Sequence, residues 1–564
     1  MPRFTYPELP LDGLLRRAAE RDPDGCALRI EGGGAAPVTT TFAELDALTD
    51  RFAACVARLA GGSRGARIGV AHTLGREFPA AYYGAVRSGN TAVLVNPLLK
   101  GPGLVHVLTT AAVEVAFVPS ATAELLAGLR ERLPALRAVV VTDTGHAGTP
   151  GDPAPGEWRP HAEALGGSPL AEALGGSPLA EALDAMPLAE ALGGPCEGVW
   201  FPPADPGADA CIQFTTGTTG APRAVRLTHR NLVANAAQTA AAHLLDTGSV
   251  TLNHLPLFHP MHLNSAVFAG ACQVLCTDPD PLASLALAAR TRATHYYGLP
   301  ARLHRTASLL AGPRPVEGVP AGPALTVVLS GGTALAPATA RTLADRLGVP
   351  VVQGYGMAEL SPLTHCQRPG SPSRGTVGRP LPGTECRVVH LESRQPVGAH
   401  TTGEVQVRGP QLMAGYLHAR TGPADGDGWF STGDIGRVDD DGELTLVDRL
   451  GDVFKYDNEL VSPTAVEHVL AQDPRVADCV VADWPHPRHG AVTWAGIVLR
   501  DPGVPDLLDT LDSIADGANA QLAGFEQIRR IEVVDSVPRT PVGKPERRGL
   551  RRSLQDRAAL EAAA

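Results

Sequence analysis

The segment from Phe214 to Val225 has the residue types of a polyphosphate site, with the sequence FTTGTTGAPRAV. Its two glycines permit backbone conformations closed to other residues, so several backbone N–H groups can point at one anion. The threonine hydroxyls add donors, and Arg223 supplies a fixed positive charge. A loop this long and constrained favours a phosphate nest over an ordinary Gly/Thr-rich turn. The residues predicted to contact phosphate are Thr215, Thr216, Gly217, Thr218, Thr219, Gly220 and Arg223.

Other glycine-rich and charged segments follow this loop towards the C-terminus. They are LSGGTAL (329–335), QGYGMAE (353–359), VGRPLPG (377–383), GEV (403–405), GYL (415–417), STGD (431–434), DR (448–449) and PRTPVGK (538–544). In this order they resemble the adenylate-forming superfamily, which comprises acyl-CoA synthetases, adenylation domains of nonribosomal peptide synthetases, and luciferases. The resemblance covers nearly the whole chain and is strongest to acyl-CoA and aryl-CoA ligases.

The resemblance implies an enzyme that uses ATP and Mg²⁺ to convert a small carboxylic acid into an acyl-AMP, releasing pyrophosphate. Attack of a carboxylate on the α-phosphorus brings two anions together, so the site must supply positive charge and positioning. The implied cation is Lys544, which bridges the carboxylate and the α-phosphate in the transition state. Judged by charge alone, Lys544 with Arg547 and Arg548 would be a solvated basic face.

The same resemblance assigns the remaining nucleotide contacts. Glu359 is the implied Mg²⁺ ligand, because Mg²⁺ is a hard cation that takes few protein carboxylates. Asp434 and Arg449 are the implied ribose-binding residues. The alternatives are a surface carboxylate for Glu359 and a turn aspartate for Asp434. The other implied ATP contacts are Gly331, Gly332, Thr333, Gln353, Gly354, Tyr355, Gly356 and Ala358.

The acyl side of the site is expected around His259, which matches the family histidine that gates or lines the carboxylate site. The alternative is a buried histidine with satisfied hydrogen bonds. His262 and Asn264, just beyond it, are candidates for the acyl pocket. Residues 252–266 contain no acidic side chain, whereas members that adenylate amino acids hold the α-ammonium with an aspartate in this region. A small polar or aromatic acid is therefore favoured over an α-amino acid or a long chain.

Several positions depart from the family pattern. Arg223 and Ala224 stand where lysine and glycine are usual, and arginine keeps the charge. Ala358 replaces a common threonine and so removes a hydroxyl near the α-phosphate. Gly451 stands at the implied hinge in place of lysine or aspartate, and its wide φ/ψ range still allows rotation.

The acyl acceptor depends on the segment KYDNELVSP (455–463). Members that form thioesters generally have glycine at the position of Asn458, where the backbone approaches the pantetheine arm. Asn458 adds bulk, and Asp457 adds negative charge. Coenzyme A is the leading acceptor, and an amine or a carrier-protein thiol is the second. A nucleotide-binding protein without catalysis is a third reading, which an intact Lys544 opposes.

These residues need a scaffold, and the sequence predicts one of α/β type. Apolar residues recur at three- and four-residue steps over 42–59, which predicts an amphipathic helix. Apolar runs at 67–71, 91–95, 115–118 and 138–141 predict strands that alternate with helices, the pattern of parallel sheets. The family resemblance adds stacked mixed sheets in a large N-terminal region.

Two changes in the sequence pattern divide the chain. Residues 162–194 contain a nine-residue repeat, beginning AEALGGSPL, which we interpret as a low-complexity insertion in a surface loop. Near residue 448 a second change predicts a small mobile α+β domain, so the expected domains are 1–448 and 449–564. The resemblance implies that this domain alternates between two orientations for the two half-reactions.

The composition limits the other partners. A net charge of -11 argues against nucleic acid or an anionic membrane, because both need a basic surface. The N-terminus lacks the pattern of a secretory signal, and no apolar run of about 18 residues predicts a membrane span. The nine cysteines are scattered without a C-x-x-C pair, so reduced thiols and a cytoplasmic location are expected.

Overall fold

The computed structural model describes residues 4–31, 37–143, 185–194, 200–215, 222–254, 259–312, 324–370, 375–457, 459–539 and 545–563. They form two compact units. The first unit draws on residues 1–215, 222–385 and 408–428. Of the described residues, the second unit draws on those within 386–407 and 429–563.

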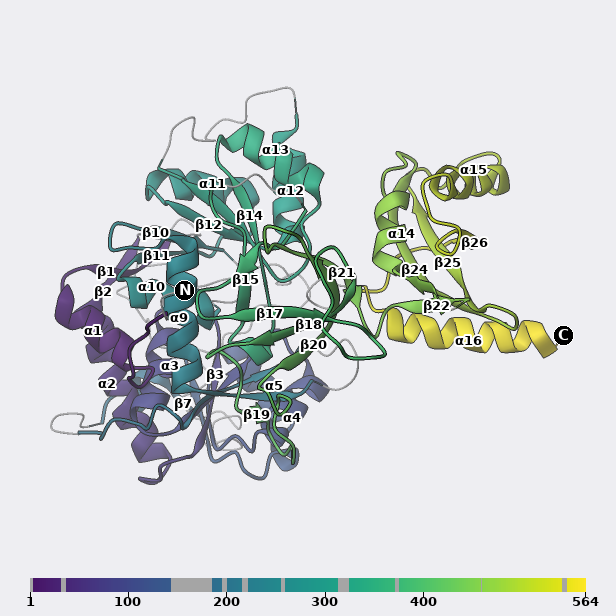
Figure 1. The fold of residues 1–564 in the computed structure, drawn as a ribbon. Coiled ribbons are helices and arrows are strands. Elements are labelled where there is room, and N and C mark those ends of the chain that lie inside the picture. The colour runs from purple at the N-terminus through teal and green to yellow at the C-terminus, as the bar shows by residue number, and fades with distance from the viewer. Residues whose placement is uncertain are drawn as a thin grey trace. The chain divides into compact units, whose positions relative to one another are not determined.

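The first unit contains an eight-stranded mixed sheet in the order β19-β9-β8-β4-β3-β5-β6-β7. Figure 1 labels β3, β7 and β19 of this sheet. Its strands are β3 (Arg67–Ala71), β4 (Thr91–Val95), β5 (Val115–Val118), β6 (Ala138–Val141), β7 (Ala185–Pro187), β8 (Asp209–Phe214), β9 (Ala224–Thr228) and β19 (Gly415–Tyr416). The strands from β8 to β7 run parallel, and β9 and β19 add antiparallel pairs. The strands predicted at 67–71, 91–95, 115–118 and 138–141 are confirmed.

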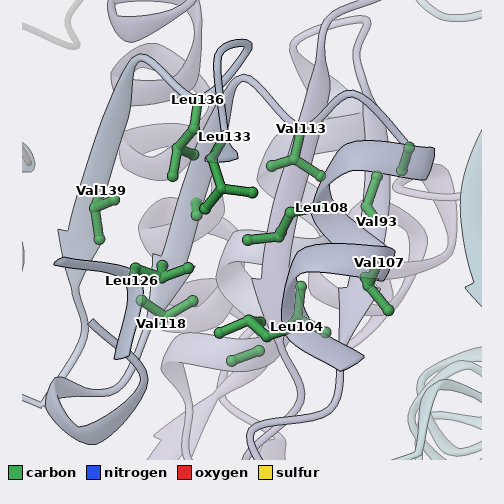
Figure 2. Close-up of a cluster of buried hydrophobic side chains, with 14 of the residues drawn as sticks. Val93, Leu104, Val107, Leu108, Val113, Val118, Leu126, Leu133, Leu136 and Val139 are labelled. Carbon is green, nitrogen blue, oxygen red and sulfur yellow. The ribbon is translucent and has the colours of Figure 1, made fainter. Parts of the chain in front are cut away.

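Helices connect these strands and bury their apolar faces on the sheet. They are α2 (Phe42–Leu59), α3 (Glu77–Arg87), α4 (Gly101–Thr110), α5 (Ser120–Ala127), α8 (Leu188–Ala191) and a 3₁₀ turn at Arg130–Arg132. The predicted helix over 42–59 begins with a capping box, in which Thr41 and Glu44 each bond the other's backbone N–H. Figure 2 shows part of the core, where leucines of α4 and α5 lie among valines of the sheet.

A nine-stranded sheet makes the other half of the first unit, in the order β16-β15-β14-β13-β12-β10-β11-β1-β2. Its strands are β1 (Cys26–Glu31), β2 (Val38–Thr41), β10 (Val250–Asn253), β11 (Cys272–Cys276), β12 (His295–Gly298), β13 (Val327–Ser330), β14 (Val351–Gly356), β15 (Leu363–Cys366) and β16 (Arg379–Pro380). The strands from β1 to β14 are parallel, so their carboxyl ends meet at one edge.

The helices of this half mostly follow its strands. They are α1 (Gly13–Arg21), α9 (His229–His243), α10 (Pro260–Ala269), α11 (Pro281–Arg290), α12 (Pro300–Leu310), α13 (Pro337–Leu347) and the 3₁₀ turn η2 (Ala358–Leu360). Four of them, α10 to α13, begin with proline, whose fixed φ suits the first helical position and whose missing N–H is not needed there.

The second unit holds most of a four-stranded antiparallel sheet and all of a five-stranded one. The former comprises β17 (Glu385–Val389), β18 (Gly403–Arg408), β20 (Phe430–Val438) and β21 (Leu444–Arg449). The latter comprises β22 (Phe454–Tyr456), β23 (Glu459–Val461), β24 (Val476–His486), β25 (Gly490–Leu499) and β26 (Ile528–Val533). Its helices are α14 (Pro463–Leu470), α15 (Leu507–Asn519) and α16 (Arg547–Ala563).

The predicted α/β class with stacked mixed sheets is confirmed. The end of the predicted insertion differs from a surface loop, because 185–187 pair with β6 and Leu188 is buried. Residues 162–184 lie outside the described residues. The second compact unit reaches back to include 386–407 and 429–448, so the boundary of movement at 448 stays a prediction. Within the described ranges, no helix is both long and apolar enough to cross a bilayer.

Candidate functional site

Three segments of the first unit converge on the carboxylate of Glu359. This carboxylate lies in η2, directly after β14, and the residue is only 6% exposed. Its Oε1 accepts a 2.7 Å hydrogen bond from the Tyr416 hydroxyl and faces Nη2 of Arg223 at 3.4 Å. The Arg223 guanidinium also lies 4.0 Å over the Tyr416 ring. Tyr416 reaches this position because β19 pairs with β9, which begins one residue after Arg223.

Tyr416 stays protonated in this arrangement and so acts as a donor. Burial is the largest cause that raises the pKa of its hydroxyl, and the nearby Glu359 charge raises it further. The sequence placed Tyr416 in a structural motif and did not predict it as a site residue. A spacing of 57 residues from Glu359 leaves no local pattern by which the contact could be found.

The Glu359 site fits Mg²⁺. Among the described residues, the hydrogen bonds of the carboxylate from Tyr416 and Arg223 both use Oε1, and Oε2 is the oxygen that would face a cation. In the part of the chain that the structure describes, no group of three or more His, Cys, Asp or Glu side chains could hold a metal. A single carboxylate suits Mg²⁺ because this ion keeps several of its waters and binds substrate phosphates.

The ends of the predicted phosphate loop are joined to each other. The Thr215 N–H donates to the Arg223 carbonyl, and the Arg223 N–H donates to the Thr215 hydroxyl, each at 3.0 Å. The predicted contacts Thr216, Gly217, Thr218, Thr219 and Gly220 lie outside the described residues. Thr215 and Arg223 therefore join the two ends of the predicted loop.

The predicted adenine segments lie at the carboxyl ends of β13 and β14. The turn after β13 contains Gly331, Gly332 and Thr333, and Gln353 of β14 accepts a 2.8 Å bond from the Leu335 N–H with its side chain. Gln353 thus fixes this turn against β14.

Farther along β14 the backbone is crowded. A Cβ at Gly356 would overlap the carbonyl oxygen of Pro362, so only glycine fits there. Gly354 precedes Tyr355, which is buried beside the ring of His365. Ala358 begins η2 beside Glu359. The residues predicted to contact ATP in the segments 331–333 and 353–358 therefore lie at one edge of the nine-stranded sheet.

His259 caps α10, and this fixes its tautomer. Nδ1 accepts a 3.2 Å bond from the Met261 N–H, so the proton of the neutral ring is on Nε2. The amide nitrogen of Gln213 lies 3.3 Å from Nε2, and a 180° turn of the amide would present its oxygen to this proton. Burial lowers the pKa of His259 to about 4, which keeps the ring neutral at physiological pH.

The other two predicted acyl-pocket residues follow on α10. His262 is buried and stacks on Tyr297, with ring centroids 4.2 Å apart. The Asn264 amide oxygen accepts a 2.9 Å bond from the Tyr83 hydroxyl, and its amide nitrogen donates to Tyr82. Asn264 therefore links α10 to α3. The sequence did not single out the half-buried His72 or the buried His254, since each stands alone after a strand.

The predicted ribose residues pair within the second unit. Asp434 of β20 lies opposite Arg449 of β21, and Arg449 Nε is 3.1 Å from Asp434 Oδ1. Asp434 is 5% exposed, and its N–H donates to the Thr432 hydroxyl. Gly433 between them has a φ of +72°, which favours glycine in this turn. The turn therefore places the Asp434 carboxylate, and the ion pair with Arg449 fixes its orientation.

The predicted hinge is held by α16. Arg551 donates hydrogen bonds to the carbonyls of Gly451 and Asp452. Farther on, Asp457 has a positive φ of 47°, and its carboxylate is 2.8 Å from His489 Nδ1. Asn458 and Lys544 lie outside the described residues, so their predicted roles stay predictions.

Comparisons with known proteins match the chain along most of its length. A family model described as AMP-binding enzyme matches residues 15–417, and a model described as AMP-binding enzyme C-terminal domain matches residues 465–544. The chain is 29% identical to 4-coumarate–CoA ligase 1 of Oryza sativa subsp. japonica, over 96% of this chain and 92% of that protein.

Two further similarities extend this finding. The chain is 30% identical to the salicyl-AMP ligase / salicyl-S-ArCP synthetase of Mycobacterium tuberculosis, over 96% of this chain and 90% of that protein. Its fold matches o-succinylbenzoate coenzyme A synthetase (MenE) from Bacillus subtilis in complex with ATP and magnesium ion. The TM-score is 0.75 at 23% identity, covering 95% of this chain and 99% of the other.

Proposed function

Because the chain belongs to the AMP-binding enzymes of the adenylate-forming superfamily, we propose that it activates a small carboxylic acid and transfers the acyl group to coenzyme A. It is an ATP-dependent, AMP-forming ligase of the acyl- and aryl-CoA ligase type, with ATP and Mg²⁺ as cofactors. The observation that carries the proposal is the buried Glu359 carboxylate, held by Tyr416 and Arg223 beside the joined ends of the phosphate loop.

In the first half-reaction a carboxylate oxygen forms a bond to the α-phosphorus, and the bond to the bridging oxygen breaks, so pyrophosphate leaves. Arg223 and the loop donors hold the polyphosphate, and Lys544 neutralises the charge that develops between the two anions. Mg²⁺, when bound at Glu359, neutralises phosphate charge. Asp434, oriented by Arg449, accepts hydrogen bonds from the ribose hydroxyls.

In the second half-reaction the acceptor sulfur bonds to the acyl carbon, and AMP leaves as its bond to that carbon breaks. A second candidate keeps adenylation and changes the acceptor to an amine or a carrier-protein thiol. The positive φ of Asp457 and its pair with His489 favour it, because this segment precedes Asn458, where the family's thioester formers have glycine. The similarity to the salicyl-AMP ligase / salicyl-S-ArCP synthetase supports the same alternative.

The test is ATP–pyrophosphate exchange with a panel of carboxylic acids, followed by AMP release with coenzyme A. Pyrophosphate exchange together with a coenzyme A-dependent thioester would support the proposal. Pyrophosphate exchange without a thioester would instead indicate that the acceptor is an amine or a carrier-protein thiol. Lys544→Ala should lose exchange while still binding ATP. ATP binding without exchange for any acid would leave a nucleotide-binding protein without catalysis and overturn the proposal.

We also propose a cytoplasmic location and no nucleic-acid partner. The net charge of -11 supports the second point, since a nucleic-acid surface needs a basic patch. Cell fractionation with an antibody against the chain tests the location, and recovery in the membrane fraction would contradict it.

A further inference from the structure

Two cysteines of the first unit lie in contact, although their positions in the chain differ by 246 residues. Cys26 is the first residue of β1 and Cys272 is the first residue of β11, and these strands are parallel neighbours in the nine-stranded sheet. The Cys272 thiol donates a hydrogen bond to Cys26 Sγ at 3.0 Å. Both side chains are free cysteines. We call Cys26 and Cys272 the thiol pair.

The local backbone brings the two sulfurs of the thiol pair to one side of the sheet. Leu28 is in register with Gln273. Strict alternation along both strands would therefore put Cys26 on one face and Cys272 on the other. A bulge breaks this alternation, because two steps along β1, from Cys26 to Leu28, match one step along β2. Neighbouring strands lie about 4.8 Å apart, so the Cα atoms are within the range that a disulfide spans.

Cys26 has the character of the reacting thiol. The hydrogen bond from Cys272 is the largest cause that lowers the pKa of Cys26, and the Arg29 charge lowers it further against the opposing effect of burial. The same hydrogen bond raises the pKa of Cys272, which keeps its proton. Burial raises the pKa of each of the other cysteines that the structure describes. The thiolate is the form that reacts with oxidants, so Cys26 should react first.

Small oxidants can reach the thiol pair, because both of its residues are half-buried. Exposure alone does not distinguish it. Cys386 of β17 is also half-buried, but burial raises its pKa to about 12. Thiols that sense oxidants combine a lowered pKa and access to solvent with a second thiol within reach. The thiol pair has all three properties.

We propose that Cys26 and Cys272 form a reversible disulfide that locks β1 to β11 when the protein meets hydrogen peroxide. The Cys26 thiolate attacks the peroxide, and the O–O bond breaks to give a sulfenic acid and hydroxide. The Cys272 sulfur then bonds to the Cys26 sulfur, and the sulfenic hydroxyl leaves with the thiol proton as water. The peroxide takes up two electrons in total. A dithiol returns two electrons and two protons and so reopens the bond.

The disulfide would join the edge of the nine-stranded sheet to the strand that follows α10. β1 and its partner β2 form that edge, and α10 ends at Ala269, shortly before Cys272. A cross-link between positions so far apart in the chain restricts the unfolded state strongly, so the oxidised first unit should be the more stable one. The lock requires neither the acid nor the acyl acceptor, and it therefore stands apart from the proposed function.

The first test maps the thiols of the full-length wild-type chain. The reduced protein is treated with a stoichiometric amount of hydrogen peroxide, its remaining thiols are alkylated, and its peptides are analysed by mass spectrometry without reduction. We expect a linked peptide that joins Cys26 to Cys272, the loss of two titratable thiols per chain, and recovery of both with dithiothreitol. Intact thiols in the pair, or a linkage to any other cysteine, would overturn the inference.

The second test separates the roles of the two thiols. Cys272→Ser should stop at the sulfenic acid, so dimedone should label Cys26, whereas Cys26→Ser should leave Cys272 unoxidised. Cys386→Ser is the matched control and should form the disulfide as the wild type does, because Cys386 lies in the second unit. Equal labelling of Cys26 and Cys386 in Cys272→Ser would contradict a reactive Cys26. The wild-type peptide map decides even where a variant does not fold.

The third test measures the lock itself. Thermal unfolding of the oxidised wild-type protein should show a midpoint about 2–5 °C above that of the reduced protein, as expected for a disulfide that closes a long loop in a large domain. Amide hydrogen exchange at residues 26–31 and 272–276 should slow on oxidation. Peroxide should change neither quantity in Cys26→Ser. A disulfide that forms with equal midpoints and equal exchange rates would overturn the lock.

Discussion

Tyr416 and Arg223 compete for the same oxygen of Glu359. The Tyr416 hydroxyl is 2.7 Å from Oε1, and Arg223 Nη2 is 3.4 Å from it, so the tyrosine makes the closer contact. Arg223 is 60% exposed at its side chain, and a bound polyphosphate would draw it towards the loop. Tyr416 would then be the contact that holds the carboxylate while Oε2 faces the cation.

Tyr416→Phe should raise the Mg²⁺ concentration needed for half-maximal pyrophosphate exchange by about tenfold, because groups that orient a metal ligand typically contribute this much. The ring under Arg223 remains, so the variant isolates the hydroxyl. A titration of exchange rate with MgCl₂ at saturating ATP measures it, with Tyr6→Phe as the control. An unchanged Mg²⁺ dependence would contradict the positioning role of Tyr416.

His259 has two roles: it caps α10, and it lies against Gln213 of β8, the strand that leads into the phosphate loop. Two substitutions can separate these roles. His259→Asn keeps a side-chain acceptor for the Met261 N–H and removes Nε2, whereas His259→Leu removes both. We expect both variants to raise the KM for the acid, but only His259→Leu to lower the unfolding free energy, by about 1 kcal/mol. Steady-state exchange and urea unfolding measure the two effects. Wild-type KM in His259→Asn would assign His259 to the cap alone.

Among the elements, α16 is the one that restrains the predicted hinge. Besides the bonds of Arg551, Arg547 Nη2 forms a 2.6 Å ion pair with Glu467 of α14. The Asp448 carboxylate before the hinge accepts bonds from Ser462 and Thr464 at the start of α14. The segment from Arg449 to Asp452 is therefore held between α14 and α16, and its carbonyls must lose the Arg551 bonds before the backbone can turn.

Arg551→Met should release this segment, because the aliphatic stem is kept and the donors are lost. We expect faster amide hydrogen exchange at residues 450–453 and faster cleavage there by a nonspecific protease. Arg552→Met on the same helix is the control, since Arg552 is exposed and should leave both rates unchanged. Equal protection in Arg551→Met and the wild type would show that the hinge is restrained by other contacts.

At the scale of the whole molecule, the buried histidines tie folding to pH. Burial lowers the pKa of His229 to about 4 and those of His243 and His365 to about 3. In the unfolded chain these rings titrate near 6.5. Above pH 6.5 both states are neutral, so their contribution is fully present. Below it the unfolded chain binds protons that the native protein excludes, and stability falls as the pH approaches 4.

The free energy of unfolding should therefore fall steeply between pH 6.5 and pH 4.5, by about 1.4 kcal/mol per pH unit for each such histidine. Urea unfolding at pH 7.5, 6.0 and 5.0 measures this slope. His365→Gln should reduce this slope by the contribution of one buried histidine. A flat profile over this range would contradict the burial of neutral histidines.

Local patterns were enough for the elements of the fold. The helix over 42–59 follows from apolar periodicity and the strand over 67–71 from an apolar run, and the structure confirms both. The order of the strands in each sheet could not be predicted from the sequence. Periodicity indicates which face of an element is buried, but not which element packs against that face. The short strand Ala185–Pro187 was assigned to a surface loop, because its pairing with β6 is invisible in a repeat.

What the sequence by itself determined about this protein is its family and the chemistry of its motifs, because a phosphate loop and an acidic metal ligand need particular residue types at short spacing. Tertiary structure alone decided which side chains meet. Tyr416 reaches Glu359 through the pairing of β19 with β9, and Asn264 of α10 meets Tyr83 of α3. Such contacts depend on how the sheets pack, and no short-range pattern in the chain records them.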